Sequence, residues 1–202
     1  LADYERLILV ALDLLDDPAA GLHAGYHAPA GVSYFVGFVL VNSRTLRDAL
    51  TLFQRYASLV VDGASWELTE DADEARFGFV QPDLQSGASR FATELLLGYV
   101  ASRLNTHFFG PDARIRTLCL SGPRPADACD LQEFMGMPLE WGAARNELVF
   151  DRKALDVGQR HSDPWVCQMM CEKAERLLGE RQSEDRLRLR VKDSFKYNIQ
   201  LG

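Results

Sequence analysis

Residues 114–151 constrain the fold of this chain more than any other stretch, because strand, helix and hairpin signals follow one another there. Apolar residues alternate with polar ones over residues 114–120, a pattern that predicts a half-buried strand. Two prolines within residues 121–125 end this strand, since proline cannot donate a hydrogen bond to a sheet. A short helix is expected over residues 127–136, followed by two strands and a tight turn over residues 139–150. The stretch therefore predicts an α+β unit.

The remainder of the chain predicts one further hairpin and several amphipathic helices. Trp66 and Leu68 alternate with polar residues, Phe77 and Phe79 flank Gly78, and an acidic turn joins the two segments. The whole chain is thus expected to be a single α+β domain, with an antiparallel sheet of about five strands covered by helices. Apolar side chains recur at helical spacing over residues 4–15, 43–57, 89–106, 165–178 and 185–199. Residues 34–41 are a buried apolar segment whose period does not decide between strand and helix.

Capping and helix-breaking residues predict several element boundaries. Asn42 or Ser43 is expected to cap the helix that follows it, and Gly63 to end that helix. Residues 19–31 are rich in glycine, which makes a helix doubtful there. Residues 179–183 are expected to form a linker between two helical segments.

Composition and charge narrow the class of protein. The chain is 47% apolar and 25% charged, as ordinary soluble domains are, and its net charge of −7 argues against a nucleic-acid surface over most of its length. Residues 181–202 hold six Lys/Arg against three Asp/Glu, whereas residues 1–180 hold sixteen against twenty-six. No apolar run approaches the ~20 residues of a membrane-spanning helix, and no secretory signal precedes the four scattered cysteines. We therefore expect reduced thiols and a cytoplasmic protein.

Seven ring-bearing side chains are the candidate ligand-binding residues. Small-molecule pockets are mostly apolar and contain only a few placed polar groups, a description that fits this set. The alternative interpretation is that they are simply the aromatic residues of the core. The seven are Tyr56, Trp66, Phe77, Phe79, Tyr99, His107 and Trp141.

Motifs for catalysis or metal binding are sparse. Cys167 and Cys171 are four residues apart in a predicted helix and could offer two metal ligands, as could His23 and His27, but no further residue completes either set. The sequence contains neither a glycine-rich phosphate loop nor a nucleophilic serine motif. We therefore predict no catalytic residue, no bound metal and no cofactor.

Residues 136–151, with the sequence GMPLEWGAARNELVFD, resemble a pattern found in one group of AraC-type transcription regulators. Members of that group tend to carry GxPxxFGAxxNxLxFD late in their N-terminal, arabinose-binding-like sensory domain, with phenylalanine commoner than the Trp141 of this chain. Residues 43–50 followed by Tyr56 are similar to the same group. The resemblance covers roughly residues 17–180, and its motifs are structural rather than catalytic.

The resemblance implies a bacterial, non-enzymatic sensor. Residues 1–180 would be an effector-binding and dimerisation domain, and residues 181–202 a linker and the start of a helix-turn-helix DNA-binding domain that follows Gly202. The effector would be a small molecule, for which a hydrophobic or aromatic compound is favoured. Its binding would shift the population of sensor states in a homodimer and so control DNA binding. No membrane partner is expected. Two alternatives stay open. One is an enzyme with an apolar pocket around His107, and the other is an interaction module whose helix at residues 4–15 or 165–178 pairs with a second copy.

Overall fold

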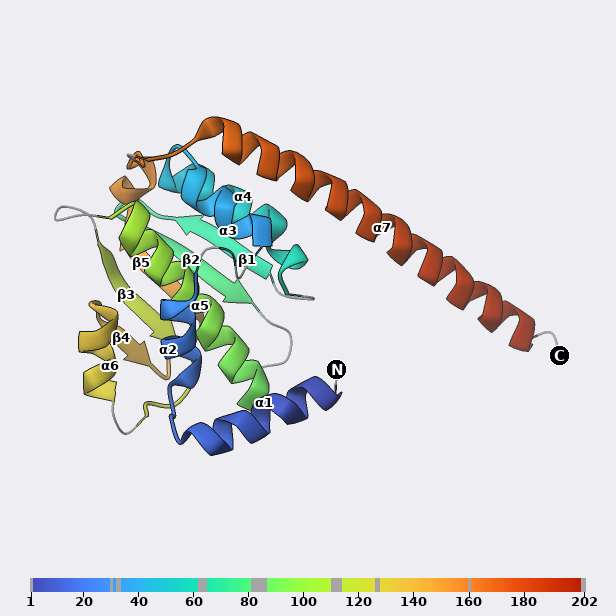
Figure 1. Ribbon diagram of the computed structural model, residues 1–202, viewed down its shortest axis with the longest axis horizontal. Helices are drawn as coiled ribbons and strands as arrows, with labels where there is room; N and C mark the ends of the chain where they lie inside the picture. The colour runs from blue at the N-terminus through green and yellow to red at the C-terminus, as the bar shows by residue number, and fades with distance from the viewer. Residues whose placement is uncertain are drawn as a thin grey trace.

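Seven α-helices and five strands make up the part of the chain that the computed structural model describes (Figure 1). This part comprises residues 2–29, 31, 34–61, 65–80, 87–109, 114–125, 128–159 and 161–200. The α-helices are α1 (Ala2–Leu15), α2 (Ala20–His27), α3 (Tyr34–Asn42), α4 (Leu46–Tyr56), α5 (Gly87–His107), α6 (Ala128–Met135) and α7 (Pro164–Gln200). The strands are β1 (Ser65–Glu70), β2 (Glu74–Val80), β3 (Ile115–Leu120), β4 (Leu139–Trp141) and β5 (Asn146–Asp151), and the 3-10 turns are η2 (Ala57–Leu59) and η3 (Arg152–Asp156).

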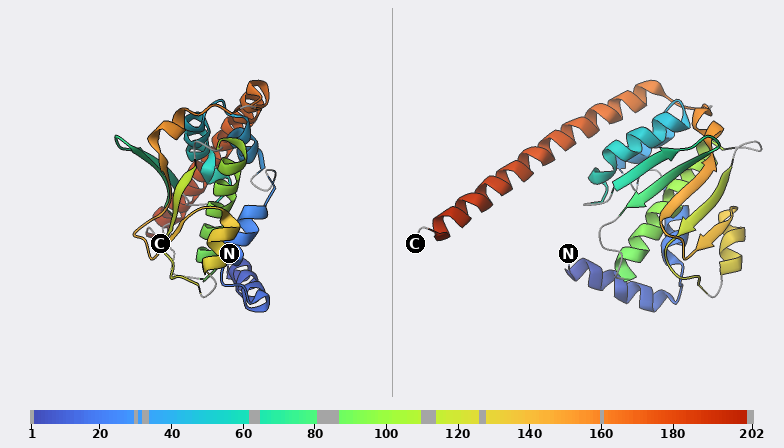
Figure 2. Two further views of the ribbon diagram at one scale, coloured as in Figure 1. Left: turned by 90° about the vertical axis from the view of Figure 1, so that its left-hand side faces the viewer. Right: turned by 180° about the vertical axis from the view of Figure 1, so that it is seen from behind.

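The strands form one sheet in the order β1-β2-β5-β3-β4, and all neighbours are antiparallel except β3 and β4. In the first hairpin Trp66 pairs with Phe79, and Leu68 with Phe77, so these four apolar side chains share one face. Helices α4 and α5 cover that face, and no α-helix of the described residues covers the opposite face (Figure 2). The predicted α+β fold, a sheet of about five strands covered by helices, is confirmed. The hairpin expected over residues 139–150 is wrong, because β4 pairs in parallel with β3, and β5 pairs with β2 and β3 instead of with β4.

The residues that resemble the family pattern shape the edge of the sheet. Gly136 and Gly142 both have a positive φ, of 65° and 72°, and such a backbone favours glycine. The carbonyl of Pro138 accepts a hydrogen bond from the Leu118 amide at 2.9 Å, which starts the parallel pairing of β3 with β4. The side-chain oxygen of buried Asn146 accepts one from the Ser121 amide at 2.8 Å, where β3 ends. The pattern therefore specifies backbone turns, which agrees with the interpretation that its motifs are structural rather than catalytic.

Helix α2 lies in the glycine-rich stretch where a helix was doubtful, and its glycines explain why it forms. It packs closely against α5 (Figure 1). A β-carbon added to Gly25 would lie 2.0 Å from the carbonyl oxygen of Leu95, and one added to Gly98 would lie 2.8 Å from that of Leu22. Only glycine permits this approach, so tertiary packing outweighs its low helix propensity.

Two further expectations about boundaries are wrong, and one lies outside the described residues. The N-cap of α4 is Thr45, whose hydroxyl accepts a hydrogen bond from the Asp48 amide at 3.1 Å, whereas Ser43 donates to the Val39 carbonyl of α3. Helix α7 continues without a break through the predicted linker at residues 179–183, because its backbone bonds tolerate one exposed glycine. Gly63 is not among the residues that the structure describes.

The first half of α7 docks on α3, α4 and η2, and the second half extends away from the other elements (Figure 1). At the start of α7, the Asp163 amide donates to the Asn42 side-chain oxygen at 3.3 Å. Further along, the Tyr56 hydroxyl donates to Glu175 at 2.7 Å, and Arg181 donates to the Ser58 carbonyl. The helix is thus held along its length up to residue 181. No helix in the described part of the chain is long and apolar enough to cross a membrane.

Candidate functional site

Three of the seven predicted ligand-binding residues lie together in the core between the first hairpin and α4. The ring of Trp66 stacks on Phe77 with centroids 4.7 Å apart, and its centroid is 5.0 Å from that of Phe79. Phe53 of α4 meets Trp66 edge-on at 5.3 Å and completes the cluster. Each of these four rings is at most 4% exposed. Phe53 was absent from the predicted set, although its position on the apolar face of α4 pointed to it.

Of the other four predicted residues, Tyr56 and Tyr99 belong to the same hydrophobic core, and Trp141 packs against it. Tyr56 is at the end of α4, where its hydroxyl faces α7. Tyr99 is buried in α5, with the Arg103 guanidinium 5.8 Å from its ring centroid. At the end of α5, the Nδ1 atom of His107 lies 3.2 Å from the side-chain nitrogen of Gln159. Trp141 is half-buried in β4.

None of the seven lines any of four cavities, with volumes between about 190 and 850 Å³, whose walls are described residues. The assignment of these seven side chains to a binding site therefore stays a prediction.

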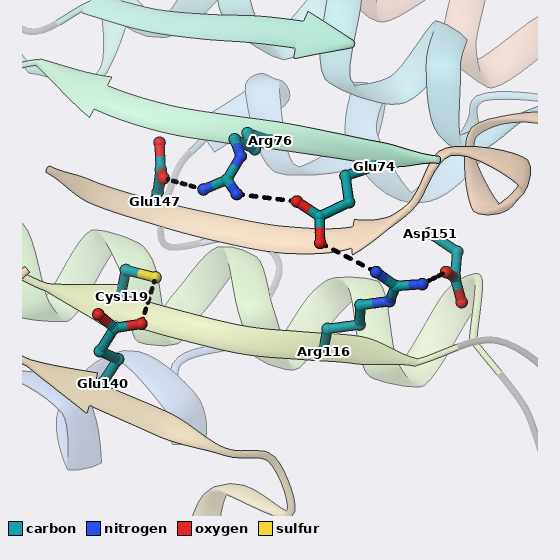
Figure 3. Close-up of polar contacts among 7 residues, drawn as sticks. All are labelled: Glu74, Arg76, Arg116, Cys119, Glu140, Glu147 and Asp151. Atoms are coloured by element: carbon teal, nitrogen blue, oxygen red, sulfur yellow. Dashed lines mark hydrogen bonds and ion pairs between the residues drawn. The ribbon is translucent and has the colours of Figure 1, made fainter. Parts of the chain in front are cut away.

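The largest of these cavities, about 850 Å³, adjoins the uncovered face of the sheet. Figure 3 shows the ion pairs that cross this face. Arg76 donates to Glu147 at 2.7 Å and to Glu74 at 2.8 Å, while Arg116 donates to Glu74 at 2.9 Å and also pairs with Asp151. The three cations that line the cavity, Arg116, Arg152 and Lys153, stand against four carboxylates, so the cavity offers little net attraction for an anion.

The thiol of Cys119, on the same face, has low nucleophilic reactivity. Cys119 lies 3.7 Å from a carboxylate oxygen of Glu140 (Figure 3). Burial, together with the charges of Glu140 and Glu147, raises the pKa of this thiol to about 11. The nucleophilic thiolate is therefore scarce at neutral pH.

A smaller groove of about 450 Å³ lies between α4 and the start of α7, and it has the character of a small-molecule site. Part of its wall is apolar, formed by Leu52, Pro164, Cys167 and Cys171. Pockets of roughly 300–1,000 Å³ with apolar walls and few polar groups are typical of ligand sites. The residues that line the groove are Asn42, Ser43, Arg44, Arg47, Asp48, Thr51, Leu52, Pro164, Cys167, Gln168 and Cys171.

The charged groups at the groove differ in whether they are already paired. Arg47 pairs with Glu70 and lies 3.4 Å from Asp156. The guanidinium of Arg44, by contrast, makes no hydrogen bond or ion pair with any residue that the structure describes. Arg44 is therefore the cation in this groove that a ligand could engage.

Tyr56 connects the groove to the docking contact of α7. Its hydroxyl donates to Glu175, and Arg55 pairs with the same carboxylate at 2.7 Å. Burial and the bond to Glu175 raise the pKa of Tyr56, so the hydroxyl stays protonated and acts as a donor. Burial also raises the pKa of the neighbouring Cys171 thiol, which lines the groove. The body of the domain and α7 therefore meet where the groove lies.

The two histidines considered as metal ligands in the sequence have structural partners. His23 pairs with Asp17 at 2.7 Å, and the rings of His23 and His27 lie 4.9 and 5.2 Å from that of Phe134. Within the described ranges, no three His, Cys, Asp or Glu side chains are grouped to hold a metal ion. The pair Cys167 and Cys171 shares one face of α7, as its four-residue spacing predicts.

Comparisons with known proteins identify a family and a solved structure with a similar fold. The family model for the N-terminal arabinose-binding domain of AraC transcription regulators matches residues 1–158. The crystal structure of the transcriptional regulator CdpR from Pseudomonas aeruginosa superposes with a TM-score of 0.65 at 15% identity, which shows a shared fold. That match covers 82% of this chain but only 54% of the regulator. The search of curated proteins gave no match.

Proposed function

This chain belongs to the family of N-terminal arabinose-binding domains of AraC transcription regulators, and we propose that it senses a small molecule and so controls DNA binding by a helix-turn-helix domain. The family supports a regulatory sensing role. The nature of the effector, the dimer and the link to DNA are our proposals. We also propose that the domain is not an enzyme, since His107, the residue of the enzymatic alternative, is paired with Gln159 and lines none of the four described cavities.

The effector site in this proposal is the groove between α4 and α7. The observation that carries it is the position of the groove, because one wall belongs to the body of the domain and the other to the helix that leads out of it. A ligand in the groove touches both walls, so its binding free energy can favour one placement of α7 over another. Tyr56 is the predicted ligand-binding residue that borders this site, through Cys171 and Glu175.

The proposed effector is an apolar carboxylate, which agrees with the hydrophobic or aromatic molecule expected from the sequence. The apolar wall favours a hydrocarbon or ring. The guanidinium of Arg44, which has no partner among the residues that the structure describes, favours an anionic group. A sugar such as arabinose fits this groove less well, because hydroxyl groups that face Leu52, Pro164 and the two cysteines would lack strong hydrogen-bond partners.

Thermal unfolding with three named probes tests this proposal. Indole-3-acetate is expected to raise the melting temperature most, neutral indole less, and arabinose not at all. A probe at a hundred times its Kd stabilises the fold by about 2.7 kcal/mol. For a domain of this size that is a shift of roughly 5–10 °C.

Three variants locate the binding. Thr51→Trp fills the groove and should abolish both shifts, whereas Lys173→Trp, at an exposed position of α7 that does not line it, should leave them unchanged. Arg44→Gln should reduce the shift with indole-3-acetate to that with indole. If Thr51→Trp binds the probes as well as the unaltered chain does, the groove is not the effector site.

The homodimer in this proposal forms through α1, because that helix exposes an apolar seam. Leu7, Val10 and Leu14 are 66%, 52% and 80% exposed and follow the three- and four-residue spacing of paired helices. Sedimentation equilibrium tests this surface: Leu14→Glu should give a monomer, and Trp165→Glu on α7 should not. The reverse result would place the interface on α7, and a monomeric unaltered chain would contradict dimerisation.

A further inference from the structure

Three sulfur atoms lie on one face of α7 within a single turn. Cys167, Met170 and Cys171 follow the i, i+3, i+4 spacing that places side chains side by side on a helix. All three are partly buried and pack against the core of the domain, and Met169 beside them is exposed instead. Both thiols are free and line the groove between α4 and α7. This face of α7 therefore carries a partly buried cluster of soft sulfur ligands.

The spacing suits a shared metal ion. Side chains one turn apart have β-carbons about 5–6 Å from each other. Metal–sulfur bonds of about 2.3 Å require two bound sulfur atoms to be at most about 4.6 Å apart. Rotation of the two cysteine side chains towards each other brings their sulfur atoms within about 4.6 Å without any movement of the backbone. The Cys167 sulfur is already oriented towards the body of the domain, 3.8 Å from the hydroxyl of Ser43.

We propose that Cys167, Met170 and Cys171 form a binding site for a soft monovalent cation such as Cu(I). Thiolate and thioether ligands select Cu(I) over harder ions, and no carboxylate or imidazole is needed to complete such a site. On binding, each thiol releases its proton to solvent, two copper–thiolate bonds form, and the Met170 sulfur donates a third electron pair. The copper is neither oxidised nor reduced in this step.

Proton release sets how the site responds to pH. Each thiol must lose its proton when the metal binds, so affinity is expected to increase as the pH increases. This proposal does not depend on the proposed effector.

An anaerobic Cu(I) titration in competition with the chromogenic chelator bicinchoninate tests the proposal on the whole chain. The unaltered chain should withhold one Cu(I) from the chelator, and Cys167→Ser and Cys171→Ser should each lose it. Met170→Leu, which keeps the volume of the side chain, should raise the Kd at least about tenfold, the lower range for loss of a supporting group at a metal site. Circular dichroism of each variant verifies that α7 is retained.

The controls are a matched thiol and a matched thioether. Cys119→Ser removes a buried thiol on the sheet, and Met169→Leu removes the exposed neighbour of Met170, so neither should change copper binding. Equal copper retention by the Cys167→Ser/Cys171→Ser double variant, or no retention by the unaltered chain, would overturn the site. Loss of copper binding in Thr51→Trp alone would not, since that variant tests the effector groove.

Discussion

Replacing Gly25 with alanine tests the packing of α2 on α5, on which the helical layer depends. The added β-carbon would lie 2.0 Å from the carbonyl oxygen of Leu95, and also 2.8 Å from the carbonyl carbon. These atoms belong to the backbone of α5, so no side-chain rotation can relieve the overlap. The two helices must move apart, and the contacts along them weaken.

The size of the effect follows from two opposing terms. Overpacking a core position costs typically 1–3 kcal/mol, and a clash with backbone is at the upper end. Alanine regains about 0.8–1.0 kcal/mol over glycine in helix propensity. We therefore expect Gly25→Ala to lower the free energy of unfolding by about 2 kcal/mol, a decrease of roughly 4–8 °C in melting temperature.

Gly179→Ala is the matched control, because it makes the same substitution in a helix with open space around it. No atom lies within 4 Å of the β-carbon that it would add, and Gly179 is exposed in α7. It should gain up to about 1 kcal/mol from helix propensity alone. Urea unfolding followed by circular dichroism measures both variants. If Gly25→Ala is as stable as Gly179→Ala, the close approach of α2 and α5 is refuted.

Three further predictions concern the core, a helix cap and a buried carboxyl. Phe77→Ala should lower the free energy of unfolding by about 3–5 kcal/mol, as for other buried rings, and Phe38→Ala at an exposed position much less, both measured by urea unfolding. Thr45→Ala should cost about 1 kcal/mol through loss of the cap of α4, and Thr45→Ser should restore it. Burial raises the pKa of the Glu94 carboxyl despite its bond to Arg90, so the folded state favours the protonated form. That stability is present below the unfolded pKa of about 4.3 and is lost as the pH rises through the folded pKa, so unfolding of Glu94→Gln should depend less on pH above about pH 4.

The strands and most of the helices could be predicted from the sequence, because each follows from a local period, but the parallel pairing of β4 with β3 could not. Trp66 and Phe79 alternate in strands that pair as expected. Helix α2 could not be predicted, because Gly25 is needed only for the close contact with Leu95 of another helix. No local sequence pattern reveals that contact. The unbroken course of α7 was missed for a similar reason, since one glycine is a weak break when the flanking residues favour a helix.

The candidate site was only partly accessible to sequence reasoning. The spacing of Cys167 and Cys171 predicted that they share a face of α7, and they do. Their neighbours across the groove, such as Arg44 and Thr51, come from α4 or the turn before it, far away along the chain. Aromatic residues drew attention to the core instead, where Trp66 and Phe77 pack ring against ring. A groove between distant helices is a product of tertiary packing and leaves no local signal.

Hydrogen exchange of the chain with and without saturating indole-3-acetate tests the central claim most directly. Our account predicts slower exchange in α4 and in residues 164–181 of α7, because the probe contacts both helices and stabilises their docking. The strands that carry Trp66 and Phe77 should show no comparable change. Protection confined to those strands, or no protection in α7, would contradict the claim that a ligand in this groove acts on the helix that leaves the domain.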